Sequence, residues 1–338
     1  MISPRTLRNL RSELSDSLLA KVGIVLVLLI LVMAVFAPLL APHSPTNQNL
    51  EEAQLPPIGF SATENQTTQK TVNGSVKIVT KKVTVNATLS HPLGTDSLGR
   101  DVLSRTMYGA RTSLLVGLLG TGMAVIIGVA IGVTAGYYGG RVDDALMRMA
   151  DVMLAFPSLV LAIALIGLWG QASFEIPDPF VVLGIAPESM PDDVVLPGTV
   201  IVVVALVNWV WFARVARGEA LSVRGEEYVK AARSMGASDR YIILRHILPN
   251  SATPILVLAT IQIAAVILLE SALSFLGFSG AQLSWGFDIA QGRQYLSSSW
   301  WIATMPGLAI VTAVVGINLI GDWLRDALDP GIGGEGGA

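Results

Sequence analysis

The chain has 338 residues, of which 52% are hydrophobic and only 14% are charged. Soluble domains carry about 25% charged residues, so this composition indicates an integral membrane protein. The formal net charge of −3 argues against nucleic-acid binding, which needs a basic face to neutralise phosphates. The sequence contains no cysteine, which excludes disulfide bonds and thiolate chemistry.

Six apolar runs are long enough to cross a bilayer, which takes about 20 residues. They predict an all-α membrane protein with six transmembrane helices near 19–41, 113–137, 148–170, 197–217, 253–275 and 302–324. The first run is too long for the core of a signal peptide, so we interpret it as a retained span. Residues 1–18 and 331–338 are then tails, and 112–330 form a five-helix core of a multi-pass protein in the cell membrane.

The charges in the loops predict which side of the membrane each loop faces. Basic residues cluster in the N-terminal tail, at 141–148, at 214–245 and at Arg325, which lie on one side if every run spans. The loop 171–198 carries acidic residues only: Glu175, Asp178, Glu188, Asp192 and Asp193. Because cytoplasmic loops are rich in Lys and Arg, both termini are predicted to be cytoplasmic and 171–198 to lie outside.

The first outer loop, 42–111, contains a polar insert at 47–90 that is rich in Thr and Asn. Within it, 75–87 has the pattern of a strand or hairpin. Three N-glycosylation sequons begin at Asn65, Asn73 and Asn86. Segments of this composition also produce sequons by chance, so glycosylation and chance both stay open.

Two helical patterns follow the insert. Before the second span, one helical face is formed by Leu103, Thr106, Met107 and Ala110. This face predicts a short helix at the membrane surface. Inside the second span, glycines recur every four residues at Gly128, Gly132 and Gly136. In lipid, such a stripe lets another helix approach closely, so it predicts a packing face rather than a ligand site.

The polar segment 226–249 lies between two apolar runs. One face of a short helix would carry Tyr228, Ala231, Ala232 and Met235. Gly236 can end this helix, and Ser238 with Asp239 can cap a second helix that begins near Arg240. An amphipathic helix beside a membrane can lie on lipid or dock into a groove on a soluble partner, and the pattern leaves both open.

Two catalytic sites can be tested against the sequence. A phosphate-binding P-loop needs Gly-Lys followed by Ser or Thr, and no lysine here follows a glycine, which excludes nucleotide binding of that type. The segment 277–280 matches the GxSG pattern of intramembrane serine proteases. Its Ser279 would need a histidine within hydrogen-bond reach, but His246 is expected about 30 Å away across the bilayer.

Ionisable residues give little sign of a metal or ion path. His43, His91 and Asp96 are metal-ligand types, but their spacing is scattered, so we expect solvated side chains and no metal. Membrane-embedded charges are expected near the span ends: Asp151, Glu270 and Asp322. A self-sufficient secondary transporter would place a carboxylate at the midplane and use broken helices, neither of which is evident. The sequence predicts no catalytic residue and no cofactor.

The segment 226–249 resembles the EAA loop of ABC-importer permeases, with the motif carried by Lys230, Ala231, Ala232, Gly236, Leu248 and Pro249. More narrowly, the chain resembles the C-type permease subunit of dipeptide, oligopeptide and nickel importers. The matching blocks are HPLGTDSLGRDVLSR, GYYGGRVDDALMRMADVMLAFPSLVLAIAL, RHILPN, LESALSFLGFS and GINLIGDWLRDALDP. The resemblance covers 91–330 and the first span. Lys230 replaces the usual glutamate, and the insert and the tail depart from the family pattern.

This resemblance implies the fold of ABC type I importer permeases and a subunit that performs no catalysis. In such importers the EAA loop, here 218–252, docks on cytoplasmic ATPases. The residues implied for this coupling are Glu226, Glu227, Tyr228, Lys230, Ala231, Ala232, Met235, Gly236 and Arg240. The implied partners are a second homologous permease, two ATP-binding subunits and an external substrate-binding protein. Peptides are the implied substrate, with nickel or oligosaccharides as alternatives, and a serine protease or a secondary transporter remains the alternative function.

Overall fold

The computed structural model describes residues 14–15, 17–72 and 75–328. Its body consists of helices: α2 (Leu18–Val35), α3 (Ala37–Leu40), α4 (Val102–Tyr138), α5 (Gly140–Leu154), α6 (Ser158–Trp169), α8 (Gly198–Arg224), α11 (Leu248–Phe275) and α13 (Trp301–Leu328). Among the described residues, five helices are long and apolar enough to cross a membrane, or six if the bent pair α5–α6 counts as one span. The protein is therefore a multi-pass α-helical membrane protein.

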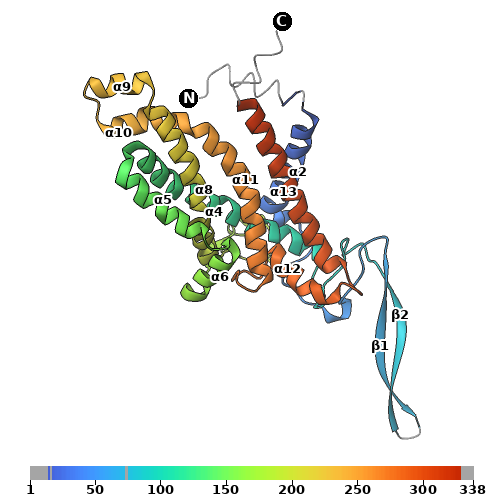
Figure 1. Ribbon diagram of the computed structural model, residues 1–338. Coiled ribbons are helices and arrows are strands. Elements are labelled where there is room, and N and C mark those ends of the chain that lie inside the picture. Colours follow the sequence, from blue (N-terminus) through green and yellow to red (C-terminus); the bar gives the residue numbers. More distant parts are fainter. Residues whose placement is uncertain (1–13, 16, 73–74, 329–338) are drawn as a thin grey trace.

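The two ends of the helical body differ (Figure 1). One end carries the start of α2, the end of α13 and the short helices α9 (Glu227–Ser234) and α10 (Asp239–Ile242); we call it the α9 end. The opposite end carries a long two-stranded hairpin and is called the hairpin end. The described chain therefore begins and finishes at the α9 end.

The third predicted span is not one helix. Residues 148–170 are divided between α5 and α6, whose axes differ by 92° across a short break. Pro157 lies at this break, where its missing N–H and its restriction of the preceding residue end a helix. The predicted third span is therefore made of two helices with a bend between them, which the sequence pattern did not indicate.

The helix α4 is longer than the sequence pattern predicted. It runs without a break from Val102 through the whole second span, so the separate surface helix predicted around Leu103 was wrong. Asp101 begins it, because the Oδ2 atom of this side chain accepts a hydrogen bond from the Ser104 backbone N–H at 2.7 Å. The residues before the span therefore continue the transmembrane helix beyond the apolar run.

The glycine stripe of α4 lies against α8. A Cβ atom added at Gly128, Gly132 or Gly136 would lie 2.3, 2.1 or 2.6 Å from a backbone oxygen of α8. These distances show that the two backbones are in direct contact, which side chains larger than hydrogen would prevent. Buried residues of both helices, including Ala124 and Phe212, continue this contact as one hydrophobic cluster.

The polar insert forms a hairpin whose second strand coincides with the predicted strand segment 75–87, whereas its first strand was not predicted. Strands β1 (Ser61–Val72) and β2 (Ser75–Asn86) pair antiparallel and project away from the helical body (Figure 1). Of the three sequons, Asn65 lies in β1 and Asn86 ends β2, whereas Asn73 lies outside the described residues. A second small sheet was not predicted; it pairs β3 (Phe174–Pro177) with β4 (Asp193–Leu196), and α7 (Pro179–Val182) lies between the two strands.

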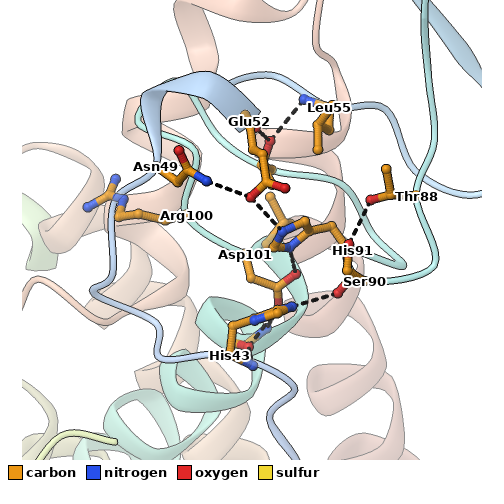
Figure 2. Close-up of polar contacts among 12 residues, drawn as sticks. His43, Asn49, Glu52, Leu55, Thr88, Ser90, His91, Arg100 and Asp101 are labelled. Atoms are coloured by element: carbon orange, nitrogen blue, oxygen red, sulfur yellow. Dashed lines mark hydrogen bonds and ion pairs between the residues drawn. The ribbon is translucent and has the colours of Figure 1, made fainter. Parts of the chain in front are cut away.

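A buried polar cluster joins the base of the hairpin to α4 (Figure 2). The His91 ring lies with Nδ1 2.9 Å from Asp101 Oδ1 and Nε2 3.5 Å from Glu52 Oε2. The rings of His43 and His91 are 4.4 Å apart. His91 and Asp96 are buried, so the expectation that they are solvated was wrong. Among the described residues, no group of three or more His, Asp or Glu side chains could hold a metal ion.

A buried ion pair ties α4 to α12 (Trp285–Gly292) beside this cluster. The Arg105 guanidinium donates from Nε to Asp288 Oδ1 at 2.8 Å and from Nη2 to the Gln282 carbonyl at 2.9 Å. Complete burial raises the pKa of the Asp288 carboxyl above its usual value, and the positive charge of Arg105 opposes this rise. The hairpin end is thus held by contacts between residues far apart in the sequence.

Candidate coupling site

The segment 226–249 folds as the helix, turn and second helix that its sequence predicts. Helix α9 ends before Gly236, whose φ of +84° suits a residue without a side chain. The Ser238 hydroxyl accepts a hydrogen bond from the Tyr241 backbone N–H at 3.4 Å and caps α10. A π-helical turn, Ile243–Ile247, then joins α10 to α11. The segment is the most distant part of the α9 end from the hairpin (Figure 1).

The helix α9 buries a different face from the one that the sequence pattern grouped together. Val229 and Ala232 are buried against the helical body, whereas Tyr228, Ala231 and Met235 are exposed. The Met235 side chain is 82% exposed. Val229, which the prediction omitted, is thus the anchor of α9, and the exposed residues are available to a partner.

Tyr137, at the end of α4, holds the segment to the body. Its hydroxyl donates a hydrogen bond to Asp239 Oδ1 at 2.5 Å. The Arg233 guanidinium lies over the Tyr137 ring, 5.3 Å from its centroid. Tyr137 also belongs to the hydrophobic cluster that contains Val229 and Ile242. Both short helices are therefore attached to the same long transmembrane helix.

A second contact joins α9 to the start of α11. The Tyr228 ring lies 5.6 Å from the His246 ring, and its hydroxyl accepts a weak hydrogen bond from Asn250 Nδ2 at 3.4 Å. The Asn250 amide also donates to the His246 carbonyl at 2.5 Å. Because Tyr228 is half exposed, its side chain contacts α11 and still faces the surface.

The charged residues of the segment are mostly at its surface. Lys230 Nζ lies 3.0 Å from Glu227 Oε1, one helical turn away, and both side chains are exposed. Glu226, Gly236 and Arg240 are also exposed. The exposed part of the segment therefore combines charged groups of both signs with the apolar side chain of Met235.

An ion pair that no sequence pattern predicts lies at the same end of the molecule. The Arg217 guanidinium on α8 donates to both carboxylate oxygens of Asp143 on α5, at 2.5 and 2.6 Å. These residues are 74 positions apart, and no sequence pattern connects them. The pair connects the helix before the 226–249 segment to the first half of the bent span.

The three charges expected within the membrane have different surroundings. Asp151 is exposed at the surface of the chain and pairs with Arg214 at 2.7 Å, and Asp322 is also exposed. Glu270 is fully buried between α11 and α4, where it accepts hydrogen bonds from Ser113 at 2.8 Å and Ser274 at 2.5 Å. Of the three, only Glu270 lies inside the protein.

Ser279, which the protease pattern singles out, has a local role. Its hydroxyl accepts a hydrogen bond from the Ala281 backbone N–H at 3.3 Å, which stabilises the turn between α11 and α12. His246 belongs to the π-helical turn at the other end of α11. The two residues are thus separated by the length of this 28-residue helix, about 42 Å at 1.5 Å per residue.

Comparisons with known proteins agree with this architecture. The family model for the "binding-protein-dependent transport system inner membrane component" matches residues 128–334, and the model for the N-terminal transmembrane domain of oligopeptide transport permease C matches 10–57. The chain is 35% identical to a probable D,D-dipeptide transport system permease protein of Escherichia coli, over 95% of this chain and 91% of that protein. It is 36% identical to the dipeptide transport system permease protein of Bacillus subtilis, over 94% of this chain and 83% of that protein.

A solved structure shows the same fold. The inward-facing MetNI methionine ABC transporter contains a chain that matches with a TM-score of 0.50 and 16% identity, over 67% of this chain and 97% of that chain. The long apolar helices and the family match together place the chain among transport components of the inner membrane. The chain belongs to the family of binding-protein-dependent transport system inner membrane components.

Proposed function

We propose that this chain is the permease subunit of an ATP-driven importer of small peptides and forms half of its translocation pathway. In this proposal the 226–249 segment docks on a cytoplasmic ATPase, the α9 end faces the cytoplasm, and the hairpin end faces outside. A second, homologous permease completes the pathway, two ATP-binding subunits supply the energy, and an external binding protein delivers the substrate. The names of the Escherichia coli and Bacillus subtilis relatives support a peptide substrate.

The observation that carries the coupling role is how α9 is attached. Its inner face is fixed by Val229 and by the contacts of Tyr137, whereas Tyr228, Ala231 and Met235 stay exposed. A helix that rests on lipid would expose large apolar residues along a whole face. This exposed surface is small and mixed with charges, which suits a groove on a protein. Movement of α9 would pass directly to α4 through Tyr137.

Substitution of Gly236 tests this role. An added Cβ atom would meet nothing within 4 Å, but its positive φ disfavours any other residue, and an Arg side chain would occupy the docking surface. In the assembled importer we expect Gly236→Arg to lower ATP-dependent peptide uptake by at least about tenfold, equivalent to about 1.4 kcal/mol. The amount of protein in the membrane should match the parent.

Gly59→Arg is the matched control, because Gly59 also has a positive φ, +89°, and open space around it, but lies at the hairpin end. This variant should keep normal uptake. Normal uptake by the Gly236→Arg importer would overturn the docking assignment. Activity of the purified chain alone, without ATPase subunits or a second permease, would favour a protease or a secondary transporter instead.

A further inference from the structure

An open hollow of about 530 Å³ lies between α9 and α10, which we call the α9–α10 hollow (Figure 1). Its lining includes Ala232, which is buried, and the ring of His246. The rings of Tyr228 and Tyr241, both half-exposed, lie 5.6 and 5.8 Å from that of His246. The exposed side chain of Met235 completes an apolar and aromatic lining that faces the surface.

Contacts within the chain hold both helices of this hollow in place. Val229 on α9 and Ile242 on α10 belong to one buried hydrophobic cluster. Asp239 accepts a hydrogen bond from Tyr137 at the end of α4. The Ser238 hydroxyl caps the first turn of α10. The hollow is thus formed before a partner binds, which lowers the entropic cost of binding.

Positive charge surrounds Tyr241 on the side of α10. A second hollow, which shares Tyr241 with the first, is lined by Arg240, Leu244 and Arg245. Both arginines are exposed, and neither forms an ion pair with any described residue. The sequence between 237 and 250 contains one acidic residue, Asp239, and it is bonded to Tyr137. Two guanidinium groups are therefore left to pair with carboxylates of a partner.

The length of the helix indicates that this surface lies in water rather than in lipid. From Asp239 to Phe275 the chain runs as one helix of 37 residues, about 55 Å long. Tilted by about 20°, it extends about 52 Å along the membrane normal. A bilayer with its headgroups is about 40–45 Å thick. Because the exposed charges of this helix lie near its beginning, the excess of about 10 Å projects at the α9 end.

We propose that the ATPase subunit inserts one large apolar side chain into the α9–α10 hollow, and that carboxylates beside this side chain pair with Arg240 and Arg245. Protein interfaces concentrate binding energy in buried aromatic pockets with a polar rim, where Tyr and Arg are frequent. The contact is thus reciprocal: α9 enters a groove on the ATPase, and the ATPase enters the hollow. The choice of the ATPase as the partner rests on the proposed function.

Photo-cross-linking identifies what fills the hollow. The assembled importer is prepared in nanodiscs with p-benzoylphenylalanine in place of Tyr241, and adducts are identified by mass spectrometry after illumination. We expect an adduct with the ATPase subunit, in a segment that contains a large apolar residue and Asp or Glu. An adduct with lipid alone, no adduct, or an ATPase segment without an acidic residue would overturn the proposal.

Charge reversal tests the two arginines. The importer is immobilised through this chain, and the rate at which ATPase subunits dissociate is measured. We expect Arg240→Glu with Arg245→Glu to raise this rate at least about tenfold. A lysine in place of the acidic residue in the cross-linked ATPase segment should restore slow dissociation. Arg325→Glu is the matched control, because Arg325 is exposed in the last turn of α13 and lines neither hollow; it should keep the parent rate.

Two further results would contradict the proposal: dissociation of the double variant at the parent rate, and a failure of the ATPase lysine to restore slow dissociation. ATP-driven peptide uptake by the parent importer separates this inference from the proposed function. Normal uptake without an ATPase adduct at position 241 removes only the hollow as a contact, whereas absent uptake removes the proposed function.

Discussion

The contact between α4 and α8 makes a quantitative prediction at Gly132. In Gly132→Ala the new methyl carbon would lie 2.1 Å from the Ala213 carbonyl oxygen, about 0.9 Å inside the 3.0 Å limit that real Cβ atoms observe. Because the obstacle is backbone, one helix must move, and overpacking of this kind costs about 1–3 kcal/mol. Alanine also stabilises a helix interior relative to glycine by about 0.5–1 kcal/mol, which offsets part of this cost.

Gly122→Ala isolates the packing effect. Gly122 lies in the same helix, and a Cβ atom there would meet nothing within 4 Å, so only the gain in helix propensity applies. Thermal unfolding of the two purified variants in one detergent should give Gly132→Ala the lower midpoint, by about 3 °C or more. Equal midpoints, or a higher midpoint for Gly132→Ala, would refute the close approach of α4 and α8 at this position.

Two further substitutions test the contacts at the two ends of the molecule. Tyr137→Phe removes the hydrogen bond to Asp239, worth about 1 kcal/mol at this partly exposed position, and should lower the peptides imported per ATP hydrolysed by about fivefold. An unchanged number of peptides imported per ATP hydrolysed would show that this contact of α4 plays no part in coupling. Arg105→Met leaves the buried Asp288 without its cation and should destabilise the protein by about 3–5 kcal/mol near neutral pH. Burial raises the pKa of Asp288, and the charge of Arg105 opposes that rise. The stability lost in Arg105→Met should therefore be smaller at acidic pH, where the Asp288 carboxyl is protonated, than at neutral pH. A variant whose unfolding midpoint differs from that of the parent by the same amount at both pH values would contradict this.

The sequence was sufficient where structure depends on local patterns. Apolar length predicted where the membrane helices lie, since each span must satisfy its own backbone hydrogen bonds. Gly236 and Ser238 predicted the turn and the cap that separate α9 from α10, because both residues act within a few positions of themselves. The strand pattern of 75–87 likewise predicted β2, although it did not identify β1 as its partner.

The errors have physical causes that can be named. Hydropathy does not detect a bend, so the apolar run across Pro157 was interpreted as one span although the proline itself was visible. The sequence pattern around Leu103 predicted a helix at the membrane surface because the buried partner of Arg105 in this segment, Asp288, is 183 residues away. The burial of His91 was not predictable for the same reason, since it depends on Glu52 and on the start of α4.

The coupling site was half predictable. The motif identified α9, but the pattern grouped Ala232 with residues that the fold exposes, because helical periodicity does not say which face the body covers. Val229, which fixes that face, is not one of the motif residues, and Tyr137 lies in a matching block that gives no sign of a contact with α9. Only the packing of α9 on the end of α4 reveals their role.

Photo-cross-linking of α9 tests the central claim most directly. A photoreactive p-benzoylphenylalanine in place of Met235, which is 82% exposed, would stand on the docking surface of the assembled importer. The same substitution at Leu89, 87% exposed at the hairpin end, is the control. The proposed function predicts a cross-link from position 235 to an ATPase subunit and none from position 89. An intact, transporting complex in which position 235 forms no adduct with the ATPase would contradict it.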